Sequence, residues 1–452
     1  TALGFAIAEG KISLEDSVSD FFPEYDPKGR SKAVTVRHLV TMTACKIVPM
    51  VKVRHNKDWL KIFFDAPLVA KPGSFYFYVN DNFYMLSAII SKVYGETLAD
   101  FLYPRLFEPL GIAKPVWEVD KFGYASGGWG LYLPIEAQAK VIYCYSQGGI
   151  YEGKQVIPAE WVREATKYQV DTIHRGQIDV QTGYGYGFWR SSLPDTYRAY
   201  GLHGQNGYVF EGKDTVLMVN CGISKDEKLC AEINKLYVHL WDEPQTAYEP
   251  ILKEYTASFG DKEQLPGRAR NYRLEDELCT QNLSTRSTMF GSMLHATMTA
   301  VMNDDIGKIS HFSFSRDEGE ALYFSWTEGG YTNRIKLGMD DRYERTEITL
   351  AGIRFHANAK AAWTKGKVFT VYIRIEEGCH LRVLEFDFSG KTPVVKNNSF
   401  PDLPNLAAYY LDFAGFPLPP VLESALINYI APVILLVGEP NFLLRSRLLK
   451  KQ

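Results

Sequence analysis

A tyrosine and an asparagine two residues apart are the pair in this sequence whose types and spacing could do chemistry. Tyr78 and Asn80 lie in residues 71–82, which read KPGSFYFYVNDN. Alternate residues of an extended segment point to the same side, so the phenol and the carboxamide could face one space. A phenol can transfer protons and a carboxamide can hydrogen-bond a substrate, and acyl transfer uses both. The pair also fits a core aromatic residue beside a helix N-cap.

The short motifs of several other enzyme classes are missing from the sequence. It contains no HExxH, no GxSxG, and no GxGxxG after a strand, which are motifs of zinc peptidases, α/β-hydrolases and dinucleotide-binding proteins. Residues 148–155 (GGIYEGKQ) resemble a phosphate loop without its final Ser or Thr. Because this segment follows a predicted helix and lacks the hydroxyl that binds magnesium, we interpret it as a tight turn and a short extended run.

Helices that would position these residues fill most of the first half of the chain. Apolar spacing and capping residues predict helices at residues 1–9, 35–40, 81–93, 97–107, 136–146 and 158–166. Strand-like runs follow at residues 184–189, 208–211 and 215–220. Because strands gather after the helices, the pattern predicts an α+β fold, with an antiparallel sheet flanked by helices, over an alternating α/β fold.

The periodicity changes in the second half of the chain. Prolines and polar residues predict a linker with helical fragments over residues 243–306. Apolar and polar residues then alternate in runs at 311–314, 321–326, 348–356, 368–375 and 381–388, separated by glycine-containing turns. The sequence therefore predicts one domain over residues 1–242 and a β-rich domain, a meander or small barrel, over residues 307–452. The basic, amphipathic segment 443–450 favours a packed terminal helix over a membrane anchor.

Composition limits the kinds of molecule that the protein could bind and the cellular compartment in which it could work. The chain of 452 residues has 50 Lys+Arg and 53 Asp+Glu, and a net charge of −3 offers no general attraction to nucleic acid or anionic membrane. Its 6 cysteines form no CxxC pair, which predicts neither a disulfide scaffold nor a zinc site and slightly favours a reducing, cytoplasmic compartment. The longest apolar run, residues 426–437, is interrupted by Pro432 and is too short to span a bilayer.

Eight sequence blocks, in this order, resemble the serine β-lactamase and penicillin-binding-protein-like hydrolases, in the branch of class C β-lactamases and esterases. The blocks are 4–16 (GFAIAEGKISLED), 35–43 (TVRHLVTMT), 72–82 (PGSFYFYVNDN), 106–112 (LFEPLGI), 127–131 (GGWGL), 153–155 (GKQ) with Pro158 and Trp161, 183–187 (GYGYG) and 203–205 (HGQ). They cover about residues 1–225, half of the chain.

Three motifs line the cleft in that family: Ser-x-x-Lys, Tyr-x-Asn and Lys/His-x-Gly. The resemblance implies that Tyr78 moves protons between nucleophile and leaving group, and that Asn80 hydrogen-bonds the substrate amide. His203, Gly204 and Gln205 match the third motif, and a backbone N–H near Asn206 would form half of the oxyanion hole. Gln205 stands where the family commonly has Gly, which leaves open how closely a substrate approaches. The resemblance implies a small-molecule or peptide substrate and no metal or organic cofactor.

The Ser-x-x-Lys motif lies, in the family, immediately before the helix that residues 1–10 resemble. This sequence starts at Thr1 inside that helix, so we expect the nucleophilic serine upstream and the printed chain to be inert in acyl transfer. The resemblance implies a serine hydrolase acting on an ester, amide, D-amino-acid peptide or β-lactam through an acyl-enzyme. The alternative is a catalytically inactive binding or sensory protein that keeps the fold.

Overall fold

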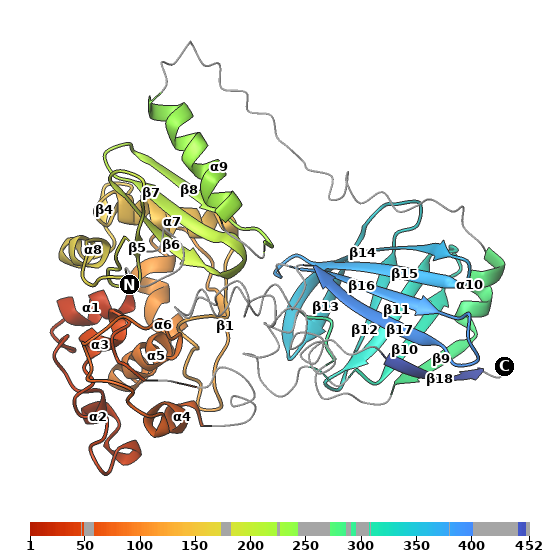
Figure 1. Cartoon of the computed structure of the whole chain (residues 1–452), viewed down its shortest axis with the longest axis horizontal. Coiled ribbons are helices and arrows are strands. Elements are labelled where there is room, and N and C mark those ends of the chain that lie inside the picture. Colours follow the sequence, from red (N-terminus) through yellow and green to blue (C-terminus); the bar gives the residue numbers. More distant parts are fainter. Residues whose placement is uncertain are drawn as a thin grey trace, which may run out of the picture. The chain divides into compact units, whose positions relative to one another are not determined.

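The computed structural model describes residues 1–46, 48, 58–172, 182–223, 227–242, 272–285, 291–294, 307, 309–378, 380–400 and 442–448. The described residues up to Asn234 form one compact unit, and those from Lys235 onward form a second (Figure 1). The first unit combines helices with antiparallel strands, and the second is rich in strands. This confirms the predicted α+β class with a C-terminal β-rich region.

The helices of the first unit follow the caps that predicted them. Thr97 accepts a hydrogen bond from Asp100 N–H at the start of α6, and Gly95 ends α5 with a φ of +72°. The predicted helix 97–107 changes to a π-helical turn, η2 (Tyr103–Phe107), after α6. The described α-helices that lie wholly or mostly in this unit are α1 (Ala2–Ala8), α2 (Val18–Phe21), α3 (Val36–Val40), α4 (Trp59–Asp65), α5 (Asp81–Tyr94), α6 (Leu98–Leu102), α7 (Ile135–Ser146), α8 (Ala159–Thr166) and α9 (Glu227–Tyr237).

The described strands of the first unit form an antiparallel four-stranded sheet in the order β5 (Trp189–Arg190), β6 (Thr196–Gly201), β7 (Gln205–Phe210), β8 (Thr215–Val219). Helix α7 packs against one face, where a Cβ added to Gly207 of β7 would come within 2.9 Å of Ile142 (Figure 1). The strand predicted at 184–189 is mostly irregular, because Gly183 and Gly187 adopt positive φ angles of +107° and +87°. Strand β6 was missed because most of its side chains are buried, so no alternation marks it.

Two short hairpins complete this unit. Strand β1 (Val116–Trp117) pairs with β2 (Leu131–Tyr132), and β3 (Ile150–Tyr151) pairs with β4 (Lys154–Gln155). The second hairpin contains the segment that resembles a phosphate loop, with Glu152 and Gly153 at its turn in positive φ. The predicted tight turn is present at Gly148 and Gly149, which have φ angles of +66° and +89°. The extended run predicted after it is wrong in part, because residues 150–155 fold back on themselves as this hairpin.

Lys46 satisfies the C-terminal end of α4. Its ammonium group is buried and donates hydrogen bonds of 3.0, 3.3 and 2.7 Å to the carbonyl oxygens of Phe63, Phe64 and Ala66. Burial lowers the pKa of Lys46 from 10.5 to about 8. Between these two pH values the unfolded chain binds more protons than the folded chain, so this lysine makes the folded state more stable as pH rises.

We therefore expect the free energy of unfolding to rise between about pH 8 and about pH 10.5 through Lys46. The rise should be smaller in Lys46→Met, which has no titrating group at this position. Urea denaturation at both pH values would measure it. Equal pH dependence in the two proteins would contradict the assignment to Lys46.

In the described part of the second unit, ten strands form an antiparallel up-and-down barrel (Figure 1). Each strand pairs with the next along the chain except the fourth with the fifth, and the first strand also pairs with the last. Helix α10 (Tyr272–Cys279) precedes the strands, which are β9 (Gln281–Thr285), β10 (His311–Arg316), β11 (Leu322–Glu328), β12 (Tyr331–Leu337), β13 (Glu344–Leu350), β14 (Ile353–Lys365), β15 (Val368–Ile375), β16 (Leu381–Asp387), β17 (Val394–Phe400) and β18 (Phe442–Leu448).

The barrel closes between β12 and β13 through side chains. The carboxamide of Asn333 on β12 donates to Thr349 O at 2.9 Å and accepts from Thr349 N–H at 2.8 Å. Further along, Thr346 Oγ1 accepts from Lys336 N–H at 3.1 Å. Both contacts fit one antiparallel register. The seam between these strands therefore holds without a regular backbone ladder.

Three expectations for the second half need correction. The helix predicted at 443–450 is wrong over its described residues, because residues 443–448 belong to β18, which pairs with β9 and β17 and takes strand geometry from them. The run 348–356 is two strands joined at Ala351 and Gly352, both in positive φ. Strand β9 lies inside the predicted linker, where Leu283 alone is apolar, so no alternation marked it. The rest of that linker lies largely outside the described residues.

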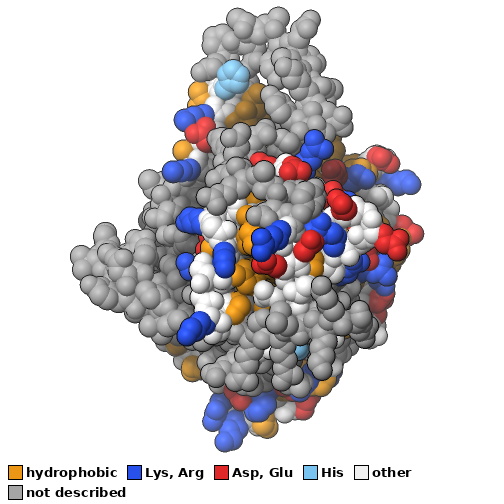
Figure 2. Space-filling view, turned by 90° about the vertical axis from the view of Figure 1, so that its right-hand side faces the viewer, with side chains coloured by type: hydrophobic (Ala, Val, Ile, Leu, Met, Phe, Trp, Pro, Cys, Tyr) orange, Lys and Arg blue, Asp and Glu red, His pale blue; other side chains and the backbone are white. Residues whose placement is uncertain are grey.

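Charges of both signs are interspersed on the surface. Figure 2 shows Lys and Arg side chains close to Asp and Glu side chains on one face. Ion pairs such as Arg345–Glu376 at 2.7 Å and Lys336–Glu344 at 3.1 Å belong to the barrel. Among the described helices, none combines the length and the apolar character needed to cross a bilayer.

Candidate active site

The loop that carries Tyr78 and Asn80 is held against the turn that follows α3. Three backbone hydrogen bonds join these segments, Val69 N–H to Cys45 O at 2.9 Å, Gly73 N–H to Thr43 O at 2.8 Å, and Phe77 N–H to Met42 O at 2.8 Å. Met42 and Cys45 have φ angles of +57° and +56°, which few residues other than glycine adopt. The loop therefore has a fixed anchor although it contains no strand.

Asn80 occupies the N-cap position of α5, but its side chain makes no capping hydrogen bond. Its carbonyl oxygen accepts hydrogen bonds from the N–H groups of Phe83 and Tyr84 at 3.0 and 3.2 Å. The residue starts the helix through its backbone, and its carboxamide is half-buried. A capping side chain would accept a hydrogen bond from a backbone N–H group of the first helical turn, and the carboxamide of Asn80 does not.

Tyr78 packs into a cluster of aromatic rings. Its ring stacks on Trp189 of β5 with centroids 5.8 Å apart, and meets Tyr184 edge-on at 6.5 Å. Trp189 also contacts Tyr200, near the end of β6, at 5.9 Å. Because Tyr78 is half-buried while Trp189 is only 1% exposed, the tyrosine lies at the border of this cluster.

The predicted block 127–131 packs directly on the start of α5. A Cβ added to Gly128 would come within 2.9 Å of Asn80 O, and one added to Gly127 would collide with Phe83 O. Gly127 also has a φ of +69°. Close backbone contact explains why glycine stands at both positions, and it ties this block to Asn80.

The predicted third motif forms the turn between β6 and β7. His203 has a φ of +66°, is 4% exposed, and its Nδ1 lies 3.4 Å from Ile223 O. A Cβ added to Gly204 would collide with Cys221 Sγ. Gln205 is exposed and has φ and ψ angles of −77° and 109°, which any residue adopts. The backbone conformation of Gln205 therefore does not require glycine, the residue that the family commonly has at this position.

Asn206 lies within the sheet, and its side chain is fully buried. It is opposite Tyr200 on β6 and Val219 on β8, and its Oδ1 accepts a hydrogen bond of 3.0 Å from Arg198. Gln205 pairs with Gly201 on β6 and begins β7. Strand β7 therefore begins directly after the turn that carries His203 and Gly204.

Ring contacts link the two predicted halves of the site. Tyr78 contacts Trp189, Trp189 contacts Tyr200, and Tyr200 is opposite Asn206 in the β6–β7 pair. The Tyr-x-Asn loop and the turn that carries His203 thus adjoin one cluster, although they are far apart in sequence.

An apolar cavity of about 320 Å³ lies next to this cluster. Phe83 both lines the cavity and packs against the aromatic cluster. Thr1, at the start of α1, also lines the cavity, together with Ser87, Trp161 and Tyr186. The hydroxyl of Ser87 is buried there without a hydrogen-bond partner. The cavity therefore extends from the beginning of α1 to Phe83 and Ser87 of α5, and its lining includes none of Tyr78, Asn80 and His203.

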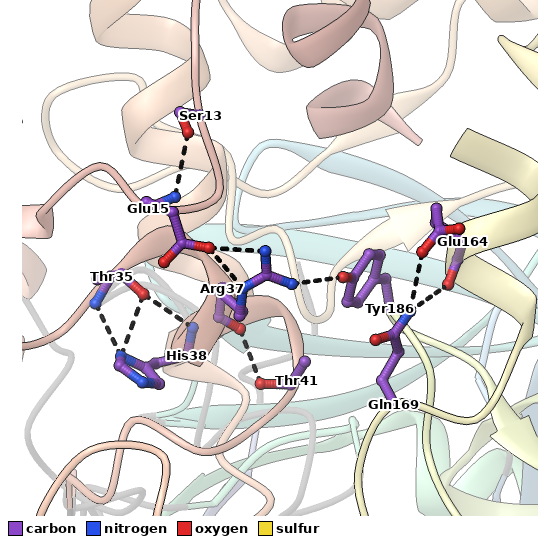
Figure 3. Close-up of polar contacts among 9 residues, drawn as sticks. All are labelled: Ser13, Glu15, Thr35, Arg37, His38, Thr41, Glu164, Gln169 and Tyr186. Carbon is purple, nitrogen blue, oxygen red and sulfur yellow. Dashed lines mark hydrogen bonds and ion pairs between the residues drawn. The ribbon is translucent and has the colours of Figure 1, made fainter. Parts of the chain in front are cut away.

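Arg37 connects three of the sequence blocks. Its guanidinium donates to Tyr186 Oη at 2.9 Å and to Glu15 at 2.7 Å (Figure 3). Tyr186 in turn stacks on Trp161 with centroids 5.5 Å apart. The sequence order of the blocks did not predict these contacts, since nothing in their spacing says which side chains meet.

The first unit is similar in sequence to known proteins. A sequence model described as Beta-lactamase matches residues 1–226. A β-lactamase of Escherichia coli (strain K12) is 29% identical over 129 residues, which cover 28% of this chain and 34% of that protein. The chain thus matches about a third of the length of that curated relative.

Two solved structures match parts of this chain. The penicillin-binding protein from Bacillus halodurans has 19% sequence identity and a TM-score of 0.40, covering 52% of this chain and 81% of that chain. The octameric penicillin-binding protein homologue from Pyrococcus abyssi has 17% identity and a TM-score of 0.41, covering 84% of this chain and 83% of that chain.

Proposed function

Because this chain belongs to the Beta-lactamase family of serine hydrolases, we propose that it forms the body of an enzyme that cleaves an ester or amide through an acyl-enzyme. The observation that carries the proposal is the common aromatic cluster. It joins the Tyr78 loop to the turn of His203 through Trp189 and Tyr200. These two segments carry two of the three motifs that line the cleft in the family.

The nucleophile in this proposal is the serine of a Ser-x-x-Lys motif that precedes Thr1. The cavity beside Thr1 supports this location, because a segment continuing α1 backwards would start at its wall. An apolar lining also favours a buried helical segment, whose backbone groups are satisfied internally.

Each predicted residue has a role in this mechanism. The serine hydroxyl adds to the substrate carbonyl, and Tyr78 relays its proton to the leaving group as the acyl-enzyme forms. Asn80 hydrogen-bonds the substrate, and a backbone N–H at the start of β7, near Asn206, stabilises the oxyanion. His203 and Gly204 shape the turn before that N–H. Water then releases the acid and restores the serine.

The proposed substrate is an ester, an amide, a D-amino-acid peptide or a β-lactam. These substrates share a carbonyl whose tetrahedral intermediate an oxyanion hole stabilises. No step of the proposed mechanism uses a metal or an organic cofactor.

Covalent labelling tests the proposal. The protein is produced together with the residues encoded upstream of Thr1 and treated with a fluorophosphonate or a fluorescent penicillin. We expect one labelled serine, identified by mass spectrometry within a Ser-x-x-Lys motif, and no labelling after that serine is replaced by alanine. An upstream sequence without this serine, or a protein that stays unlabelled, would favour the binding or sensory alternative.

A further inference from the structure

Met42 lies beneath the segment that carries Tyr78 and Asn80. It follows α3 in the turn that anchors the loop, and its side chain is 0% exposed. A φ of +57° points this side chain in a direction that ordinary helical or extended backbone would not allow. Because few residues other than glycine adopt this φ, the backbone of the turn is strained at Met42.

Three contacts from Met42 bracket the two candidate catalytic residues. Its carbonyl oxygen accepts from Phe77 N–H at 2.8 Å, immediately before Tyr78. Its Sδ accepts from Val79 N–H at 3.5 Å, between Tyr78 and Asn80. The same sulfur accepts from Asn82 Nδ2 at 3.3 Å, in the first turn of α5.

Met42 also belongs to the aromatic cluster. It packs with Tyr184, Trp189 and Tyr200, which are the rings that connect Tyr78 to the β6–β7 turn. A thioether is both apolar enough to pack among rings and able to accept weak hydrogen bonds. One side chain therefore contacts the backbone of the loop on one side and the rings against which Tyr78 packs on the other.

We propose that Met42 is a positioning residue, whose thioether fixes the orientation of the Tyr78–Asn80 segment over the aromatic cluster. This inference rests on the proposed function, because the segment matters for acyl transfer only if Tyr78 and Asn80 act in it. Leucine has a similar volume but no acceptor, so Met42→Leu removes the two hydrogen bonds to sulfur and keeps most of the packing.

The test is a double-mutant cycle in the protein with its upstream residues, measured as the rate constant of acylation by a fluorescent penicillin. We expect Met42→Leu to lower this rate constant by about 10-fold to 100-fold, the range expected for a misplaced reacting group. In the Tyr78→Phe background the same change should have a smaller effect, because the part of it that acts through Tyr78 is already lost and only the part through Asn80 remains. A methionine that only packs would show additive effects.

Met85→Leu is the matched control. Met85 lies in α5, is also 0% exposed, and undergoes the same chemical change away from the loop. We expect it to change the melting temperature about as much as Met42→Leu but to leave acylation near the wild-type rate. Wild-type acylation in Met42→Leu, or a loss that only follows the loss of folded protein, would overturn the proposal. A wild-type protein that is not labelled at all would instead refute the proposed function.

Discussion

Replacing Tyr78 with phenylalanine should slow acylation of the complete enzyme by about 10²–10⁴-fold, the usual contribution of one positioned proton-transfer group. The substitution removes only the hydroxyl, so the ring can keep its stacking on Trp189 at 5.8 Å. The fold should therefore stay intact while proton transfer fails. Stopped-flow acylation with a fluorescent penicillin measures the rate, and thermal unfolding checks the fold.

Tyr76→Phe is the control for this prediction. Tyr76 packs on Tyr184 and Trp189, with centroids 5.3 and 5.6 Å apart, so it loses the same atom in the same cluster. We expect acylation near the wild-type rate. Equal losses in Tyr76→Phe and Tyr78→Phe would mean that ring packing, not proton transfer, explains the effect. An unchanged rate in Tyr78→Phe would remove Tyr78 from the mechanism.

Gly204→Ala should have the largest effect on stability among the changes proposed here. Gly204 has a φ of +80°, where an alanine is strained by about 1–2 kcal/mol. The new Cβ would also collide with Cys221 Sγ and come within 3.0 Å of Ile223, and overpacking costs about 1–3 kcal/mol. We expect a total destabilisation of about 2–5 kcal/mol, with slower acylation because the turn of His203 shifts. Calorimetry and acylation rates check the two effects.

Gly212→Ala separates strain from collision. Gly212 has a φ of +74°, and a Cβ there would meet nothing within 4 Å. This variant should lose only the backbone part, about 1–2 kcal/mol, and should keep its acylation rate. Equal destabilisation in the two variants would show that the contact with Cys221 costs nothing.

Local signals in the sequence predicted much of the first unit. Helix α6 begins after Thr97 and helix α5 ends at Gly95, as these residues predict, because caps act within a few residues. Strands failed where burial removes alternation, as in β6, or where partners distant in sequence decide the structure, as in β18. The β-rich character of the second half was predictable, but its closure into a barrel depends on side-chain contacts such as Asn333 with Thr349.

In the candidate site, too, local sequence motifs predicted some residues, and contacts between distant segments were not predicted. Tyr78, Asn80 and His203 were found from short motifs, and their roles remain predictions. Met42 and Trp189 were missed because their importance comes from contacts across the fold: a thioether under the loop and a ring between two segments. Residue type and spacing predict which groups could react, but not which neighbours hold them in place.

The seam of the barrel has a consequence for how this protein meets other molecules. A strand with free N–H and C=O groups along its edge is a template on which another chain can add a strand, and such edges lead to aggregation. Asn333 imitates a neighbouring main chain with its carboxamide, and so occupies both groups of Thr349. One amide side chain thereby withdraws part of the edge from foreign strands, a protection that a purely apolar seam would not give.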